Sequence, residues 1–196
     1  MREDVFKLPQ GKVDQLTDAL RKIIENGRFQ KLAAFHNAAP CPHHDLGGPK
    51  FLSWHRLYSW ELEKLLGFPL PYWDFTQNAE VPQLWREIMV TLPQPDSAGG
   101  SDCSTNSKYV SKMQGNIDID ARSNRKQMHE AYMTDNFETF MDQLDSPHTQ
   151  MHGVMGCHMA KGQIWPPYDP VFWLIHAGVD RQFAIWQVAR RKKKTG

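Results

Sequence analysis

Histidine is the residue of this sequence best placed to do chemistry, with nine copies in a chain of 196 residues. His148 and His152 are four residues apart, so on a helix they lie on one face and converge on one point. Such a pair can chelate a transition metal that accepts imidazole nitrogen. The spacing alone is weak, because solvated histidines and histidines paired within a core show it too.

A third histidine strengthens this interpretation. His176 ends the otherwise apolar run Phe172–Ile175. An unsatisfied buried imidazole costs about 1–3 kcal/mol, so we expect His176 to be paired or ligated. Together with His148 and His152 it can form one three-coordinate site on two neighbouring helices.

The N-terminal half repeats this arrangement. Its histidines are His36, His43, His44 and His55, which make a second set of three imidazoles possible. The carboxylate pattern of zinc hydrolases such as HExxH is absent from both sets. Two all-imidazole sites with open positions favour a pair of copper ions over magnesium or calcium, which prefer oxygen.

The elements that position these residues are predicted to be helices. Apolar residues at helical spacing indicate helices at Gly11–Gly27, Phe29–His36 and Phe51–Gly67, with a loop at Pro40–Pro49. Residues Pro69–Phe75 are predicted to be an irregular aromatic segment. No strand pattern is convincing, so the chain is predicted to be mostly helical.

The second half is predicted to continue in the same way. A helix is plausible at 81–92 and a loop at 93–108, while 109–132 is ambiguous. A helix is predicted from Asp135 to Leu144, followed by a break at which Ser146 caps a new helix carrying His148 and His152. Asp169 and Pro170 then open a last helix that runs to about Arg190.

Composition narrows the class of protein. Lys plus Arg is 23 against 22 for Asp plus Glu, and this near-neutral balance argues against a nucleic-acid partner. No apolar stretch is long enough to span a membrane, and Met1–Asp4 shows no apolar signal region. We expect one soluble domain over 1–196, with the basic residues after Arg190 as a solvated tail. The compartment and the oligomeric state are not indicated.

Several phrases of the sequence resemble the type-3 dicopper family of tyrosinases, catechol oxidases and molluscan hemocyanins. The resemblance runs from about residue 30 to residue 188, and its motifs are Phe51–Tyr58 with Glu61, Pro71–Phe75, His148–His152, Tyr168–Arg181 and Ile185–Gln187. It implies a mainly α fold, an antiparallel four-helix bundle that encloses a dinuclear copper site and carries long irregular loops.

The resemblance also implies ligands. The first copper would be held by His36, a loop histidine and His55, and the second by His148, His152 and His176. The family's spacing puts the loop ligand at Leu46, so this loop carries an insertion. His44 is nearer that spacing, whereas Cys41 and His43 match the C-x-H arrangement in which some members crosslink cysteine to the ligand by a thioether. Both histidines stay candidates, with His43 preferred.

The activity implied is oxidation of small phenolic or catecholic substrates, o-diphenols becoming o-quinones, with dioxygen as co-substrate. In the family, hydroxylation of monophenols is linked to an Asn after the first ligand of the second copper, working with a nearby Glu through a water. Thr149 stands at the Asn position here, and Glu138 resembles the Glu, or is an ordinary exposed helix residue. Monophenol hydroxylation is therefore in question, while diphenol oxidation is not.

The remaining reactive residues have plainer explanations. Cys103 and Cys157 are predicted to be ordinary thiols or one disulfide. Asp180 and Arg181 either fix the orientation of a helix and its imidazole or form a plain salt bridge with each other. Four tryptophans are predicted to lie in the core, and two histidines have no family counterpart and are placed on the surface or behind the ligands. They are Trp54, Trp73, Trp173 and Trp186, and His129 and His158.

The chief alternative is a reversible dioxygen carrier of the hemocyanin type, which uses the same six histidines without turnover. Such carriers shield the coppers with a β-rich domain after the last ligand helix, and only 20 residues follow His176 in this chain. We therefore expect an accessible site and an oxidase. A zinc or structural-metal protein is a more distant alternative.

Overall fold

The computed structural model describes residues 2–38, 49–78, 80–82, 121–160, 162 and 164–195. Its helices are η1 (Val5–Lys7), α1 (Gln10–Glu25), α2 (Arg28–Ala38), α3 (Pro49–Leu66), α6 (Ala121–Met133), α7 (Phe137–Met155), η2 (Cys157–Ala160), η3 (Pro166–Tyr168) and α8 (Pro170–Thr195). Within those ranges the extended segments form no sheet, only an isolated bridge between Asp4 and Tyr72. The mainly helical prediction is confirmed.

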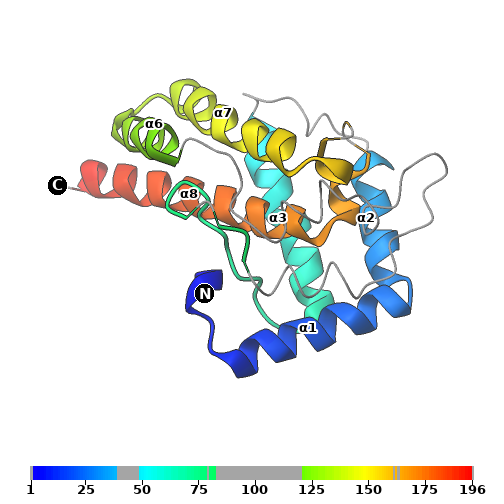
Figure 1. Cartoon of the computed structure of the whole chain (residues 1–196). Helices are drawn as coiled ribbons and strands as arrows, with labels where there is room; N and C mark the ends of the chain where they lie inside the picture. Colours follow the sequence, from blue (N-terminus) through cyan, green and yellow to red (C-terminus); the bar gives the residue numbers. More distant parts are fainter. Residues whose placement is uncertain are drawn as a thin grey trace.

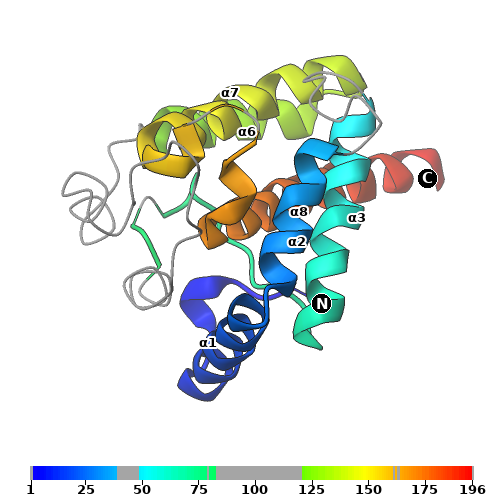
Figure 2. The same ribbon diagram turned by 90° about the vertical axis from the view of Figure 1, so that its right-hand side faces the viewer.

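Four helices carry the predicted ligands. Figures 1 and 2 show α2 and α3 lying next to each other, while α8 runs across them and α7 lies over α8. The arrangement brings segments that are distant in sequence, α3 and α8 above all, into direct contact. The finer prediction of an antiparallel four-helix bundle is not confirmed by it.

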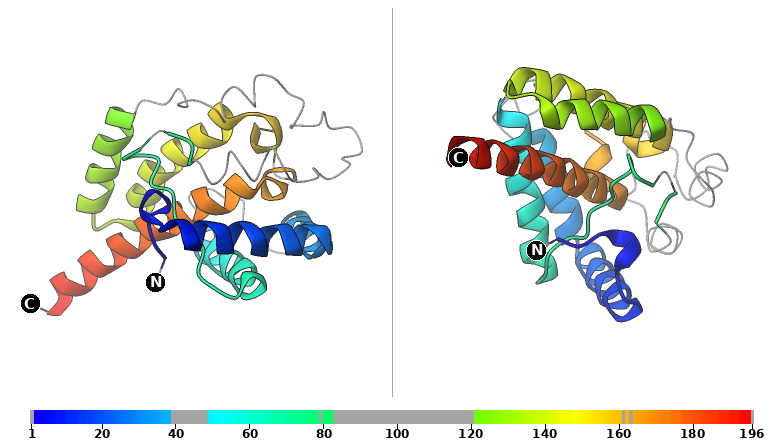
Figure 3. Two further views of the ribbon diagram at one scale, coloured as in Figure 1. Left: turned by 60° about the horizontal axis from the view of Figure 1, so that its bottom comes forward. Right: turned by 90° about the vertical axis from the view of Figure 1, so that its left-hand side faces the viewer.

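The first predicted helices are confirmed almost to the residue. In α1 the residues Leu16, Leu20, Ile23 and Ile24 are buried on one face, and the helix ends before Gly27, whose φ of +75° suits a residue without a side chain. At the other end of the chain, α8 extends to Thr195, beyond the predicted end. Figure 3 shows its last turns projecting from the rest of the molecule.

The predicted helix break before His148 is wrong. α7 is continuous from Phe137 to Met155, with Pro147 inside it. A proline in a helix interior costs about 3 kcal/mol, because it removes one backbone hydrogen bond and crowds the preceding turn. Leu144, Pro147 and Met151 are all buried, so packing on both sides of the proline offsets that cost.

α7 also begins at Phe137, two residues after the predicted start at Asp135. Asn136 caps it, since its side chain accepts a hydrogen bond from the backbone N–H of Thr139 at 2.8 Å. The helix α6, within the range left ambiguous by the sequence, packs on α7 and α8. Its Met128 and Ala131 are buried with Phe140.

The core forms two clusters. The larger joins α1, α2, α3 and α8 and contains the fully buried Trp73 and Trp173, with Trp54 packed against it. The smaller joins α3, α6, α7 and α8 and has Trp186 at its margin. The prediction that the four tryptophans belong to the core is confirmed for Trp73 and Trp173, whereas Trp54 and Trp186 are partly buried and pack against the clusters.

A close backbone contact fixes the part of α8 that carries His176. The N–H of Trp73 donates to the carbonyl of Leu174 at 3.2 Å. A Cβ added to Gly178 would lie 2.3 Å from the Trp73 carbonyl oxygen, closer than non-bonded atoms approach. Only glycine lets the 72–74 segment lie against α8 at this level.

Three predictions concern parts of the chain outside the described residues. They are the loop histidines His43 and His44 with Cys41, the helix predicted beyond residue 82, and the loop at 93–108. In the described residues, no helix is both long enough and apolar enough to cross a membrane.

Candidate metal centre

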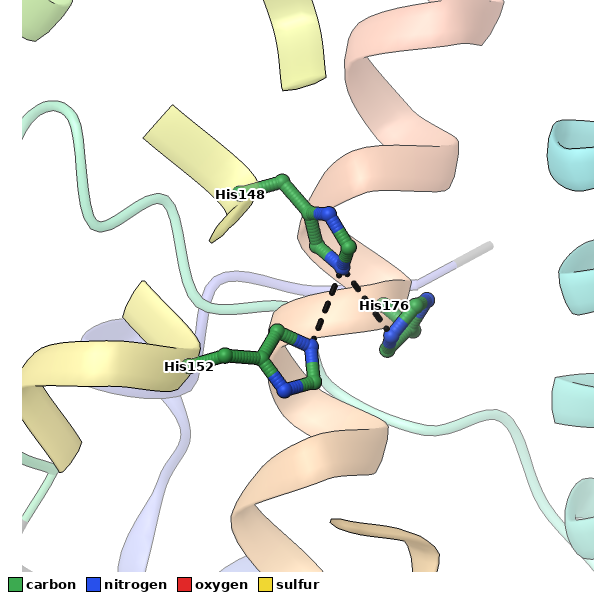
Figure 4. Close-up of side chains that lie close together, drawn as sticks. All are labelled: His148, His152 and His176. Atoms are coloured by element: carbon green, nitrogen blue, oxygen red, sulfur yellow. Dashed lines mark hydrogen bonds between the residues drawn. The ribbon is translucent and has the colours of Figure 1, made fainter. Parts of the chain in front are cut away.

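Three histidines meet where α7 lies against α8. His148 and His152 come from α7 and His176 from the second turn of α8. The Nε2 atom of His148 lies 3.1 Å from Nε2 of His152 and 3.3 Å from Nε2 of His176. Figure 4 shows the three rings turned toward one another, and one nitrogen from each lies within 4.8 Å of the others. That is the geometry of a site for one ion.

Two more histidines face this set from the other side. The Nε2 atoms of His36 on α2 and His55 on α3 are 3.3 Å apart. The ring of His55 stacks on that of His176, with centroids 4.3 Å apart and planes 14° from parallel. The two predicted sets are therefore neighbours in space. His43 and His44 lie outside the described residues, so the third member of this set is undefined.

Hydrogen bonds decide which nitrogen faces the centre. Nδ1 of His55 donates to the carbonyl of Phe51 at 2.8 Å, and Nδ1 of His152 donates to the carbonyl of Met159 at 3.1 Å. A carbonyl only accepts, so in both rings the proton sits on Nδ1. In both rings Nε2 then carries a lone pair that points toward the other histidines, as a metal ligand requires.

Burial keeps the rings of His152 and His176 neutral. Burial, followed by the charge of His148, lowers the pKa of His152 to about 3. Burial also holds the pKa of His176 well below its usual range, with His55 and the other neighbouring histidines adding to the effect. The desolvated interior disfavours the imidazolium form. Both rings are therefore in the form that binds metal at ordinary pH.

The donor set fits copper. Contacts of 3.1–3.3 Å join Nε2 of His36 to that of His55 and Nε2 of His148 to those of His152 and His176, so the imidazole nitrogens converge as metal ligands do. Imidazole suits copper, zinc, iron and nickel, whereas magnesium and calcium prefer oxygen ligands. None of the described residues around the histidines' shared cavity has a carboxylate.

The rings of two phenylalanines pack against the histidines. The ring of Phe172 lies 4.1 Å from that of His176 and also contacts His36, on the other side. Phe51 packs against His55 at 4.6 Å and His148 at 5.2 Å. Both phenylalanines are buried, so they exclude water and limit how the imidazoles can turn.

A cavity of about 360 Å³ reaches the histidines. Its inner wall includes the buried His176, and its outer part includes Thr149 and Gly153, which are exposed. Apart from the histidines, the described residues of the lining are mostly apolar, and Thr149 is the polar side chain among them. The cavity therefore connects the candidate metal site with the surface.

Glu138 lies away from this cavity. It is exposed in the first turn of α7. Ten residues separate it from His148, or about 15 Å along a helix. Among the described residues, Asp145 has a carboxylate oxygen 3.6 Å from Nδ1 of His148, and sequence reasoning missed it. Its signal was present in the sequence, a carboxylate one helical turn before a predicted ligand.

The other histidines and the cysteines differ in their surroundings. His129 is exposed, whereas His158 is buried and stacks on Trp165, next to the Met159 carbonyl that holds His152. Cys157 is disulfide-bonded, so the thiol interpretation is wrong for this residue. Cys103, like Cys41, lies outside the described residues.

Asp180 and Arg181 do not pair with each other. Asp180 accepts hydrogen bonds from Arg56 of α3 at 2.5 Å and from Arg2 at 2.5 Å, while Arg181 pairs with Asp74 at 3.3 Å. These bonds tie α8 to α3 and to the 72–74 segment. They hold the helix of His176 against the helix of His55.

The sequence matches the tyrosinase family, described as the common central domain of tyrosinase, over residues 26–133 and 93–189. Its relatives include hemocyanin 1 of Megathura crenulata, 32% identical in an alignment 228 positions long that covers 95% of this chain and 6% of the relative. Unit G of the hemocyanin beta-C chain of Helix pomatia is 30% identical in an alignment 212 positions long that covers 97% of this chain and 52% of the relative.

A bacterial enzyme is related as well. The tyrosinase of Streptomyces glaucescens is 26% identical in an alignment 216 positions long that covers 86% of this chain and 76% of the relative. The chain thus spans 6% of the length of the two Megathura hemocyanins it matches and about half of the Helix unit. Both hemocyanins and tyrosinases are among the relatives, so likeness alone does not separate oxygen carriage from oxidation.

Proposed function

The chain belongs to the family of the tyrosinase central domain, the type-3 copper proteins, and on that premise we propose that it is a copper-dependent oxidase of small phenols. It converts o-diphenols to o-quinones and uses dioxygen as the oxidant. His148, His152 and His176 hold one copper. His36, His55 and a loop histidine, His43 or His44, hold the other.

The cavity is the observation that supports an oxidase. Its volume of about 360 Å³ is far more than dioxygen needs. It falls in the range of about 300–1,000 Å³ that is typical of small-molecule sites. It extends from buried His176 to exposed Thr149 and Gly153, so a phenol can reach the histidines from solvent. A carrier needs no such space.

The residues of the chain would bind and orient the substrate. Phe51 and Phe172 offer apolar faces to its ring, and Thr149 is the polar side chain at the mouth. The lowered pKa values of His152 and His176 keep these imidazoles neutral, so a neutral phenol that enters meets no imidazolium charge beside them. When bound, the copper pair would supply the redox chemistry, in which two catechols together lose four electrons and four protons and one dioxygen is reduced to two waters.

Diphenols are the preferred substrates in this proposal. Thr149 replaces the Asn that the family links to monophenol hydroxylation, and its hydroxyl donates to Asp145 rather than to a group near Glu138. The arrangement that would take a proton from a monophenol is therefore missing from α7. We expect a monophenol to react at least about tenfold more slowly than its catechol, or about 1.4 kcal/mol in barrier.

The test compares a matched pair of substrates. The protein is loaded with copper, and dioxygen consumption and quinone absorbance are recorded with 4-tert-butylcatechol and 4-tert-butylphenol. Quinone formation from the catechol, with dioxygen consumed in proportion, is the expected result. The same protein loaded with zinc serves as the control and forms no quinone.

A reversible dioxygen carrier is the second candidate. The observation in its favour is the identity of 32% to hemocyanin 1 across 95% of this chain. The same experiment separates the two functions. Dioxygen uptake that reverses when the gas is removed, while the catechol stays unoxidised, would establish the carrier and contradict the oxidase.

A further inference from the structure

Asp145 lies one helical turn before His148 on α7, next to Thr149 and His148, which line the cavity. Its Oδ1 atom is 3.6 Å from Nδ1 of His148 and accepts a hydrogen bond from Oγ1 of Thr149 at 3.1 Å. The His148 side chain is 7% exposed and the Asp145 side chain 30%. One carboxylate therefore faces both a predicted ligand and a residue that lines the cavity.

Two other predicted ligands, His55 and His152, can be compared with His148. Nδ1 of His55 and Nδ1 of His152 are each held by a backbone carbonyl. In contrast, Nδ1 of His148 faces a carboxylate and has no hydrogen bond within 3.5 Å among the described residues. A carboxylate is a stronger acceptor than a carbonyl and makes an imidazole a more basic ligand. A closure of a few tenths of an ångström would turn this approach into a hydrogen bond.

The contact with Thr149 acts on the cavity. A threonine hydroxyl has one proton to donate and two lone pairs with which to accept. Because Thr149 donates its proton to Asp145, its lone pairs remain for a donor in the cavity. The hydroxyl group of a phenol is such a donor. Asp145 thus determines that Thr149 accepts from the substrate instead of donating to it.

We propose that Asp145 is a positioning residue that orients His148 as a copper ligand and Thr149 as an acceptor for the substrate hydroxyl. The first role rests on the proposed function only in so far as His148 binds copper. The second rests on the entry of a phenol into the cavity. The two roles have separate readouts, copper affinity and KM.

The experiment uses four variants of α7 and one control. Asp145→Glu keeps the charge on a longer side chain. Asp145→Asn keeps the size of the side chain and removes its charge. Asp145→Ala removes both contacts, and Thr149→Val removes only the hydroxyl. Asp142→Asn, at an exposed position on the same helix, changes a carboxylate with no ligand near it and is the control.

Copper affinity is measured by titrating the metal-free protein with copper against a competing chelator. Asp145→Ala is expected to weaken one of the two bound coppers by about 10–100-fold and leave the other unchanged, as loss of a carboxylate behind a ligand does. Asp145→Asn gives a smaller loss, because its amide oxygen still accepts. Thr149→Val and Asp142→Asn bind both coppers like the wild type.

Kinetics with the catechol as substrate test the second role, in which Thr149 accepts from the substrate hydroxyl. Thr149→Val and both Asp145 variants raise KM, and in Thr149→Val kcat stays within a factor of about two because the ligands are untouched. The conservative Asp145→Glu restores part of the copper affinity. Asp142→Asn changes neither KM nor kcat.

Two outcomes would overturn the proposal. The first is wild-type copper affinity at both sites in folded Asp145→Asn and Asp145→Ala, and if the alanine variant does not fold, the isosteric asparagine variant decides. The second is an unchanged KM in Thr149→Val. A wild-type protein that binds two coppers but oxidises no catechol contradicts the proposed function instead, and the copper titration still tests Asp145.

Discussion

The two halves of the candidate centre are built on different supports. The C-terminal half takes His148, His152 and His176 from two helices, and one nitrogen of each lies within 4.8 Å of the others. The N-terminal half has His36 and His55 on helices, with Nε2 atoms 3.3 Å apart, and its third predicted ligand in a loop outside the described residues. On a helix the spacing of the histidines predicts how they lie relative to one another, whereas the spacing in a loop predicts no such geometry.

The halves nevertheless share their packing. His55 of one half stacks on His176 of the other, and Phe172 contacts imidazoles of both. Asp180 joins the two helices that carry this stacked pair. A substitution in one half should therefore affect the other half as well. The following predictions test the size of that effect.

Loss of one histidine from either half is expected to have the largest effect. His36→Ala and His176→Ala should each lower catechol oxidation by roughly a thousandfold or more, about 4 kcal/mol in barrier, because dioxygen reduction needs both metal positions. Initial rates of quinone formation measure this. His129→Ala, at an exposed position, is the control. If either variant keeps a tenth of the rate, that half is not required.

Phe172 tests the wall that the halves share. It is buried and contacts imidazoles from both, so Phe172→Ala should cost about 3–5 kcal/mol in the free energy of unfolding. Phe172→Leu keeps most of the volume and should cost less. Urea denaturation of the metal-free protein gives both values. A cost below about 1 kcal/mol for the alanine variant would show that the wall collapses around the gap.

Two glycines compare the supports of the C-terminal half. Gly178→Ala places a Cβ against the Trp73 carbonyl and should destabilise the protein by about 1–3 kcal/mol. Gly153→Ala, in α7 with open space around the added atom, should stabilise it by about 0.5–1 kcal/mol through helix propensity. Thermal melts of the two variants should shift in opposite directions. Shifts of the same sign would contradict the assigned contact.

The stability of the metal-free protein is also expected to depend on pH. The pKa of His152 is about 3 in the folded protein, below its ordinary value of 6.5, so the unfolded chain takes up a proton first as the pH falls. The stability is thus full above pH 6.5 and is lost between there and about 3. The slope is about 1.4 kcal/mol per pH unit for each such imidazole, and the pKa of His176 is lowered in the same direction.

Denaturation of the metal-free protein between pH 7 and pH 5 measures this slope. His152→Gln removes one of the two imidazoles and should give a shallower dependence than the wild type. An equal slope in the two proteins would mean that His152 is not kept neutral by folding.

Much of this architecture could be predicted from local sequence. The four-residue spacing of His148 and His152 predicts their shared helix face, which the structure confirms. Asp169 and Pro170 predict the start of α8, and the Asp169 side chain does accept from the N–H of Val171 at 2.9 Å. Helical periodicity and end signals act within a few residues, so a single sequence contains them.

What the sequence did not predict depends on tertiary packing. Pro147 indicates a helix break by local rules, but it is buried, and packing keeps α7 continuous. The resemblance pointed to Glu138, whereas Asp145 is the carboxylate that lies 3.6 Å from His148, because which residue reaches His148 depends on one turn of helix geometry. The stacking of His55 on His176 joins positions 121 residues apart, which no local pattern encodes.

The copper content of the protein tests the central claim most directly. Metal-free wild-type chain, reloaded with copper and freed of excess metal, should contain two coppers per chain. The triple variant His148→Ala, His152→Ala, His176→Ala should keep its fold by circular dichroism and contain one, held by the N-terminal half. A folded triple variant that still contains two coppers would contradict the account.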